Sequence, residues 1–161
     1  MEYGGFWRRF LAYIIDSIIV NIATSLVGGL LGAGAGAGIA GLSGGDFDEA
    51  AMLALFSVST LIALVGTWLY FALMESSKLQ ATVGKLALGM VVTDLNGERI
   101  SFLRATGRYF AKIVSAMILL IGYMMVGFTQ RKQGLHDMMA STLVYKTRDP
   151  ASVRSSASVF E

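Results

Sequence analysis

The chain has 161 residues, of which 55% are apolar and only 15% charged, with 19 glycines and a net charge of +2. A chain this short has too little interior to bury so much apolar surface, so the composition excludes a disordered protein and argues against a soluble domain. Without cysteine there are no disulfides or thiolate metal sites, and a single histidine excludes a multi-histidine metal site. We therefore expect an all-α integral membrane protein.

Two apolar stretches are long enough to cross a bilayer. Asp16 is the only charged side chain in the first, near residues 10–31, and the second, near residues 51–74, carries no charge. A membrane-spanning helix needs about 20 mostly apolar residues. The pattern predicts two spanning helices, at about residues 8–31 and 51–74. Because Asp16 and Asn21 interrupt the first stretch, we do not interpret it as a cleaved signal.

The region between these helices is rich in glycine, which fills half of positions 28–45. The spacing of Gly28, Gly32 and Gly36 would let a neighbouring helix approach closely if the region is helical. Alternatively the helix frays here, because an interior glycine costs about 1 kcal/mol against alanine. We place a Gly-rich extracellular loop at about residues 32–50.

The distribution of lysine and arginine predicts the orientation. Arg8 and Arg9 precede the first span, the loop between the spans is acidic, and residues 75–112 carry six basic side chains. Basic residues favour the cytoplasmic side of a membrane. We expect a cytoplasmic N-terminus and a cytoplasmic 75–112 segment.

A third helical segment is expected at about residues 101–129, and its apolar part, residues 113–129, is marginal in length for a span. It either crosses fully, which would export the basic tail, or dips into the bilayer and returns through Gly122. The positive-inside rule favours the return, with the tail inside. Residues 147–161 are expected to form a flexible tail.

A small cytoplasmic β-hairpin is predicted at about residues 86–103. Asn96-Gly97, a strong turn signal, lies between the candidate strands 90–93 and 99–102. Residues 143–145 are a candidate third strand.

A basic stripe follows the hairpin. Arg104, Arg108 and Lys112 recur every four residues and so share one face of a helix. Such a stripe typically lies against anionic lipid headgroups.

A polar sector on the first helix contains the candidate ion or proton site. Asp16 shares this sector with Ser17, Asn21 and Thr24 at 100° per residue. Asp16 lies about 10 Å along the axis from Arg9, so it must face protein, water, an ion or a proton inside the hydrocarbon. An intramembrane carboxylate is a candidate functional site; the alternative is a structural hydrogen-bond acceptor. For the other three, hydrogen bonding between helices is the stronger interpretation.

Motifs of enzymes are missing. The chain has no nucleophile elbow, no Walker loop and no HExxH, and His136 has no partners at metal-ligand spacing. We expect no catalytic activity, no cofactor, no metal and no nucleic-acid partner.

Several short motifs together resemble the RDD family of bacterial membrane proteins, named for one arginine and two aspartates. The opening Tyr3-Gly4-Gly5-Phe6-Trp7-Arg8-Arg9-Phe10-Leu11-Ala12-Tyr13-Ile14-Ile15-Asp16 carries the arginine at Arg9 and the first aspartate at Asp16. The second aspartate falls at Asp137 in Gln133-Gly134-Leu135-His136-Asp137. Ala81-Thr82-Val83-Gly84-Lys85, Gly89-Met90-Val91-Val92 and Asn96-Gly97-Glu98 resemble the middle of the family. A single RDD-type domain over residues 1–146 is therefore expected.

The resemblance implies a multi-pass protein of the bacterial cytoplasmic membrane with a role in transport, and sodium/proton exchange is suggested for some members. Asp16 would bind a monovalent cation or a proton, and Arg9 and Asp137 would pair in an ion network that includes His136 and Lys85. Because two or three helices cannot enclose a pathway, transport would require a homo-oligomer in the lipid bilayer. The alternative is a non-catalytic membrane scaffold or partner subunit that the Arg-Asp-Asp network holds together.

Overall fold

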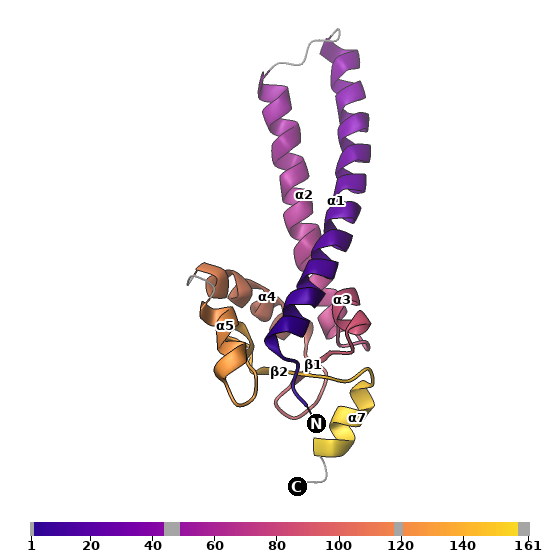
Figure 1. Cartoon of the computed structure of the whole chain (residues 1–161). Helices are drawn as coiled ribbons and strands as arrows, with labels where there is room; N and C mark the ends of the chain where they lie inside the picture. Colours follow the sequence, from indigo (N-terminus) through magenta and orange to yellow (C-terminus); the bar gives the residue numbers. More distant parts are fainter. Residues whose placement is uncertain (1, 44–48, 118–120, 158–161) are drawn as a thin grey trace. The chain divides into compact units, whose positions relative to one another are not determined.

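A computed structural model of the chain describes residues 2–43, 49–117 and 121–157. The fold is mostly helical, with one small antiparallel sheet (Figure 1). Its elements are α1 (Phe6–Ser43), α2 (Glu49–Ser76), α3 (Val83–Ala87), β1 (Val91–Asp94), α4 (Phe102–Met117), α5 (Ile121–Phe128), α6 (Leu135–Met139), β2 (Thr142–Tyr145) and α7 (Pro150–Ala157). The chain divides into two compact units. We call residues 18–69 the two-helix unit and residues 1–17 with 70–161 the mixed unit.

The two-helix unit consists of the long apolar parts of α1 and α2. Two stretches, Phe6–Gly38 and Glu49–Ser76, are long and apolar enough to cross a membrane. Large apolar side chains along both helices are exposed, such as Leu30 at 77% and Phe56 at 69%. The two predicted long helices are therefore present, with the exposed apolar surface that a lipid environment would cover.

The predicted end of the first helix at about residue 31 is wrong, because α1 continues through the glycine tract to Ser43. The rest of the predicted loop, residues 44–48, lies outside the described residues. Alanine and leucine fill most positions between the glycines, and their helix propensity offsets the glycine cost. A Cβ built at Gly28, Gly32 or Gly38 would meet no atom within 4 Å. Within the described part of the chain, these glycines are therefore not used for close packing.

The predicted hairpin is wrong, because the sheet of the mixed unit pairs other segments of the chain. β1 pairs antiparallel with β2, with Val91 opposite Tyr145 and Asp94 opposite Thr142. The Asn96-Gly97 turn is present, with Gly97 at a φ of +79°, but residues 99–102 form no strand. Instead the Ser101 hydroxyl accepts the Arg104 backbone N–H at 3.2 Å and so caps the start of α4. The candidate third strand is the true partner of β1.

The N-terminus is tied to this sheet. The Gly4 backbone N–H donates to the Val144 carbonyl at 2.8 Å, and the Lys146 backbone N–H donates to the Glu2 backbone carbonyl at 2.9 Å. Residues 2–4 therefore run along the free edge of β2, which fixes where α1 begins.

The predicted third helical segment is divided in two. α4 and α5 are separate helices (Figure 1). They pack against each other, and both contact α6. Their connection, residues 118–120, lies outside the described residues, and Gly122 lies within α5. Of this segment, residues 113–117 belong to α4 and residues 121–128 to α5; whether the segment crosses the membrane or returns, and on which side the tail lies, stay predictions.

The predicted lipid-facing role of the basic stripe is wrong for two of its three residues. Arg108 is only 1% exposed, and Lys112 points to a buried carboxylate. Only Arg104 is exposed, with Asp94 at 3.5 Å. The opposite face of α4 carries exposed apolar side chains, including Leu103 at 80% and Met117 at 77%. α4 is thus polar inside and apolar outside, because its cations have carboxylate partners in the interior.

Candidate functional site

Asp16 is buried in the mixed unit with a set of hydrogen-bond donors. Its carboxylate, 1% exposed, accepts the Tyr70 hydroxyl at 2.8 Å, the Thr82 hydroxyl at 2.5 Å and the Gly84 backbone N–H at 2.8 Å. These partners come from the end of α2 and the start of α3. All three donors are electrically neutral, so hydrogen bonds to uncharged groups hold the first aspartate.

The contact between α1 and α3 requires a glycine. A Cβ at Gly84 would clash with the backbone carbonyl of Ala12 and come within 3.0 Å of the Asp16 carboxylate carbon. Ala12 is itself only 1% exposed. Two small residues thus bring the Gly84 backbone N–H, which lies in the first turn of α3 and has no partner inside that helix, onto the Asp16 carboxylate.

The other three predicted members of this site have different surroundings. Thr24 donates its hydroxyl to the carbonyls of Val20 and Asn21 in its own helix, at 2.8 and 3.3 Å. Ser17 is half-buried, and Asn21 is exposed. The sequence missed Thr82 and Gly84, because they lie more than 60 residues from Asp16 along the chain and form no polar pattern with it.

Arg9 connects three segments of the mixed unit. Its guanidinium pairs with Asp137, which confirms the predicted contact. It also donates to the Gly4 carbonyl at 2.8 Å and to the Lys132 carbonyl at 2.7 Å. The family arginine therefore fastens the start of α1 to the segment before α6.

Asp137, which is fully buried, is saturated with donors. One oxygen accepts two N–H groups of Arg108, at 2.9 and 2.6 Å, and the other accepts Arg9 and the Gly134 N–H at 3.2 Å. The His136 ring lies at 3.4 Å from the same carboxylate. Two guanidinium groups on one carboxylate form a strong, oriented contact.

Glu75, at the end of α2, is the second acid of this cluster. It is 1% exposed, accepts Arg108 at 2.8 Å and Lys112 at 3.4 Å, and pairs with Lys85. Arg108 thus bridges Glu75 and Asp137. We call this connected set the ion cluster. Its members are His136 and the charged residues Arg9, Glu75, Lys85, Arg108, Lys112 and Asp137.

Sequence reasoning placed Lys85, His136, Arg9 and Asp137 in one network but missed Glu75. A signal for it exists: Glu75 is the first acid after a span without charge, and α4 carries its cations opposite an apolar face. In a helix that meets lipid with its apolar side, a basic stripe indicates acidic partners in the interior.

Burial and charge set the protonation of the cluster outside the long helices. Burial alone would raise the pKa of Asp137, but Arg108 and then Arg9 outweigh it and hold this pKa well below its usual range. Burial lowers the pKa of Lys85 to about 7, against the opposing charge of Glu75. Burial also lowers the pKa of His136 to about 3. Asp137 is therefore ionised and His136 neutral at physiological pH.

The contacts of Asp16 and of Asp137 are more typical of residues that stabilise a fold than of residues that react or bind a ligand. Among the described residues, no group of three or more histidine, cysteine, aspartate or glutamate side chains could hold a metal ion. Asp137 has its lone pairs occupied by protein donors, while Asp16 has neutral hydroxyls as neighbours. The first is a permanent charge paired with cations, and the second is held by uncharged donors.

Comparisons with known proteins identify one matching family and two relatives. A sequence model of the RDD family matches residues 3–141. The chain is 40% identical to the uncharacterized protein YxaI of Bacillus subtilis (strain 168), over 89% of this chain and 97% of that one. It is 30% identical to the uncharacterized membrane protein YteJ of the same organism, over 88% of this chain and 80% of that one. No solved structure matches the chain.

Proposed function

This chain belongs to the RDD family, and we propose that it is a non-enzymatic, multi-pass protein of the bacterial cytoplasmic membrane that serves as a scaffold or partner subunit. The observation that carries the proposal is the saturation of Asp137 and Glu75 by Arg9, Arg108 and two lysines. A carboxylate held by two guanidinium groups has no remaining capacity to bind a transported ion. The ion cluster therefore serves to fix the structure of the mixed unit.

Three features support the membrane location. Both long helices are apolar and exposed along most of their length, and the outward face of α4 is apolar as well. YteJ is named a membrane protein. Basic residues gather in residues 75–112 and before the first span, so we place the N-terminus in the cytoplasm.

Partner binding would use the exposed apolar surface of the helices. Large apolar side chains that soluble proteins would bury cover α2 and the outer face of α4. Lipid covers part of this surface, and we propose that a second copy or another membrane protein covers the rest. A photo-crosslinking residue at Leu103 tests this in living cells: a defined protein adduct supports a scaffold, and adducts to lipid alone contradict it.

Monovalent cation/proton exchange is the second candidate, and the neutral surroundings of Asp16 favour it. The hydroxyls of Tyr70 and Thr82 can each reverse from donor to acceptor, so the site can hold the carboxyl group in either protonation state. Transport would require a homo-oligomer, because two long helices cannot enclose a path.

Proteoliposomes distinguish the two functions. The purified chain is reconstituted with an internal pH dye and a proton gradient, and Na⁺, Li⁺ or K⁺ is added outside. A scaffold leaves the gradient unchanged. If a cation dissipates the gradient, Asp16→Asn should abolish this effect while the exposed Glu98→Gln leaves it intact, and exchange would then replace the scaffold proposal.

A further inference from the structure

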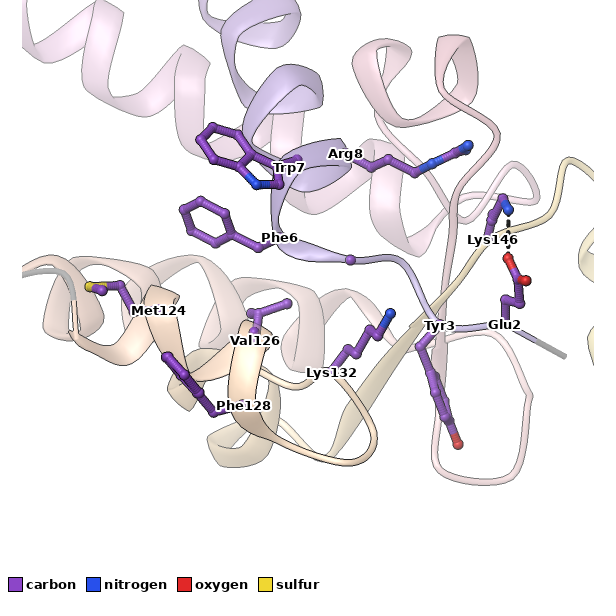
Figure 2. Close-up of a pocket in the computed structure, with 12 residues that line it drawn as sticks. Glu2, Tyr3, Phe6, Trp7, Arg8, Met124, Val126, Phe128, Lys132 and Lys146 are labelled. Atoms are coloured by element: carbon purple, nitrogen blue, oxygen red, sulfur yellow. Dashed lines mark hydrogen bonds and ion pairs between the residues drawn. The ribbon is translucent and has the colours of Figure 1, made fainter.

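A pocket of about 550 Å³ opens in the mixed unit between the start of α1 and α5 (Figure 2). One part of its wall is aromatic and apolar: Phe6 and Trp7 from α1 face Met124 and Phe128 of α5 (Figure 2). Trp7 is 73% exposed and Phe128 is 87% exposed. Such a surface is costly in water, so the pocket is suited to an apolar occupant.

The lining also contains three basic side chains. Arg8, Lys132 and Lys146 line the pocket, and Glu2 is the acid among the lining residues. Glu2 pairs with Lys146 at 2.5 Å (Figure 2). One N–H group of Arg8 donates to the Leu88 carbonyl at 3.1 Å, which is a neutral partner. Arg8 and Lys132 therefore still leave a positive charge on the rim, which favours an anion beside the apolar wall.

The ion cluster holds this rim in place. Arg9, which follows Trp7 and Arg8 in the chain, donates to the carbonyls of Gly4 and Lys132. Lys132 has a φ of +47°, a left-handed conformation that a residue with a side chain rarely adopts. Its ammonium lies near Gly5, at 3.9 Å from the position of an added Cβ. The backbone that carries this cation is thus held by a buried network and does not depend on a flexible surface loop.

We propose that this pocket binds one anionic phospholipid, with the phosphate at Lys132 and Arg8 and the acyl chains along Trp7 and Phe128. This inference rests on the proposed function, in which the chain is inserted into a membrane. The pocket opens where the first apolar stretch begins, which is the level at which tryptophan and lipid headgroups meet. Basic pockets at this level recognise anionic headgroups.

Trp7 provides the readout. In a Trp68→Phe background, Trp7 is the remaining tryptophan, since the chain has two. The full chain is reconstituted in phosphatidylcholine vesicles with a small fraction of brominated lipid, either phosphatidylglycerol or phosphatidylcholine. The proposal expects stronger quenching of Trp7 by brominated phosphatidylglycerol; equal quenching by the two lipids overturns it.

Matched variants locate the preference. Lys132→Gln should lower the preference for the anionic lipid roughly fivefold, the effect of one basic side chain at a membrane surface. Arg131→Gln removes the same charge from the adjacent exposed residue, which does not line the pocket, and should leave the preference unchanged. An equal loss in both variants would mean general surface attraction and would contradict the proposal.

Two further measurements distinguish the lipid site from binding of free phosphate and from a failure of membrane insertion. Soluble glycerol phosphate at millimolar concentration should not displace the brominated lipid; if it does, the site binds free phosphate and the lipid assignment is wrong. Resistance to alkaline extraction measures insertion independently. A chain that is extracted and shows no quenching by either lipid refutes the proposed membrane function, whereas an inserted chain quenched equally by both refutes only the lipid site.

Discussion

Asp16 and Asp137 are the two family aspartates, and both are almost completely buried, yet their surroundings are opposite. Two hydroxyls and one backbone N–H hold Asp16, whereas two guanidinium groups hold Asp137. A charge surrounded by charges must stay ionised, because losing it leaves buried cations without partners. A carboxylate among neutral dipoles carries no such requirement. The same residue type therefore serves as a fixed charge in one place and a hydrogen-bond acceptor in the other.

Replacing each aspartate by asparagine gives the largest expected contrast. Asp137→Asn leaves Arg9 and Arg108 partly unpaired in the interior and should lower the free energy of unfolding by about 3–5 kcal/mol. Asp16→Asn keeps an oxygen for Gly84 and an amide for the Thr82 hydroxyl, so its cost should stay near 1 kcal/mol, to order of magnitude about one hydrogen bond. Denaturant unfolding in detergent micelles measures both. Equal losses would mean that Asp16 also depends on its charge.

One methyl group added at Gly84 should break the contact between α1 and α3 that encloses Asp16. Gly84→Ala places a Cβ against the Ala12 carbonyl and the Asp16 carboxylate. Since backbone must move to relieve this overlap, we expect a loss of about 3 kcal/mol, at the upper end of overpacking effects. Gly66→Ala is the control: a Cβ there meets nothing within 4 Å, and it should stabilise helix α2 by up to about 1 kcal/mol. A tolerated Gly84→Ala would show that α1 and α3 are not in close contact.

The two long helices were predicted from composition, and the Arg9–Asp137 pair from the resemblance to the RDD family together with the position of Arg9 at the start of the first span. A mostly apolar stretch of more than about 20 residues has few alternatives to a long helix, and an arginine at the start of such a stretch needs an acid nearby. The partners of Asp16 were beyond prediction. Thr82 and Gly84 reach it through a close approach of two helices, and close approaches leave no periodic pattern in the sequence.

The wrong strand pairing and the wrong role for α4 have separate causes. Asn96-Gly97 favours a turn, but the residues after it also form a helix start, since Ser101 caps α4. Local turn chemistry therefore could not decide the partner of β1. For α4, the spacing of Arg108 and Lys112 identified one helix face correctly, but only the position of Glu75 decides whether that face is inside or outside.

The stability of the ion cluster should fall on mild acidification because of one histidine. The pKa of His136 is about 3 in the folded chain and about 6.5 in the unfolded chain. Between these values the unfolded chain binds more protons, so stability decreases as the pH falls from 6.5 toward 3, by up to about 1.4 kcal/mol per pH unit. The effect of His136 is best measured between about pH 6.5 and about pH 5, because Lys85, with a pKa of about 7, titrates above this range.

His136→Gln is the matching variant, since His136 is the single histidine of the chain. Unfolding measured at about pH 6.5, 5.8 and 5 should show a slope in the wild-type chain and almost none in the variant. An unchanged slope in the variant would assign the acid sensitivity to carboxylates, and a flat wild-type profile would mean that His136 is charged beside Asp137.

The smallest expected effect belongs to a single neutral donor on Asp16. Tyr70→Phe removes a hydroxyl that donates to the Asp16 carboxylate at 2.8 Å and accepts the Val83 backbone N–H at 3.2 Å. Asp16 keeps Thr82 and Gly84, so the loss should be about 1 kcal/mol, the net value of an ordinary hydrogen bond. Tyr13→Phe, at a side chain 58% exposed on the same helix as Asp16, should change stability by less than about 0.5 kcal/mol. A loss of about 3 kcal/mol for Tyr70→Phe would be the size expected for a broken charge pair, and Asp16 would then belong with Asp137 as a fixed charge.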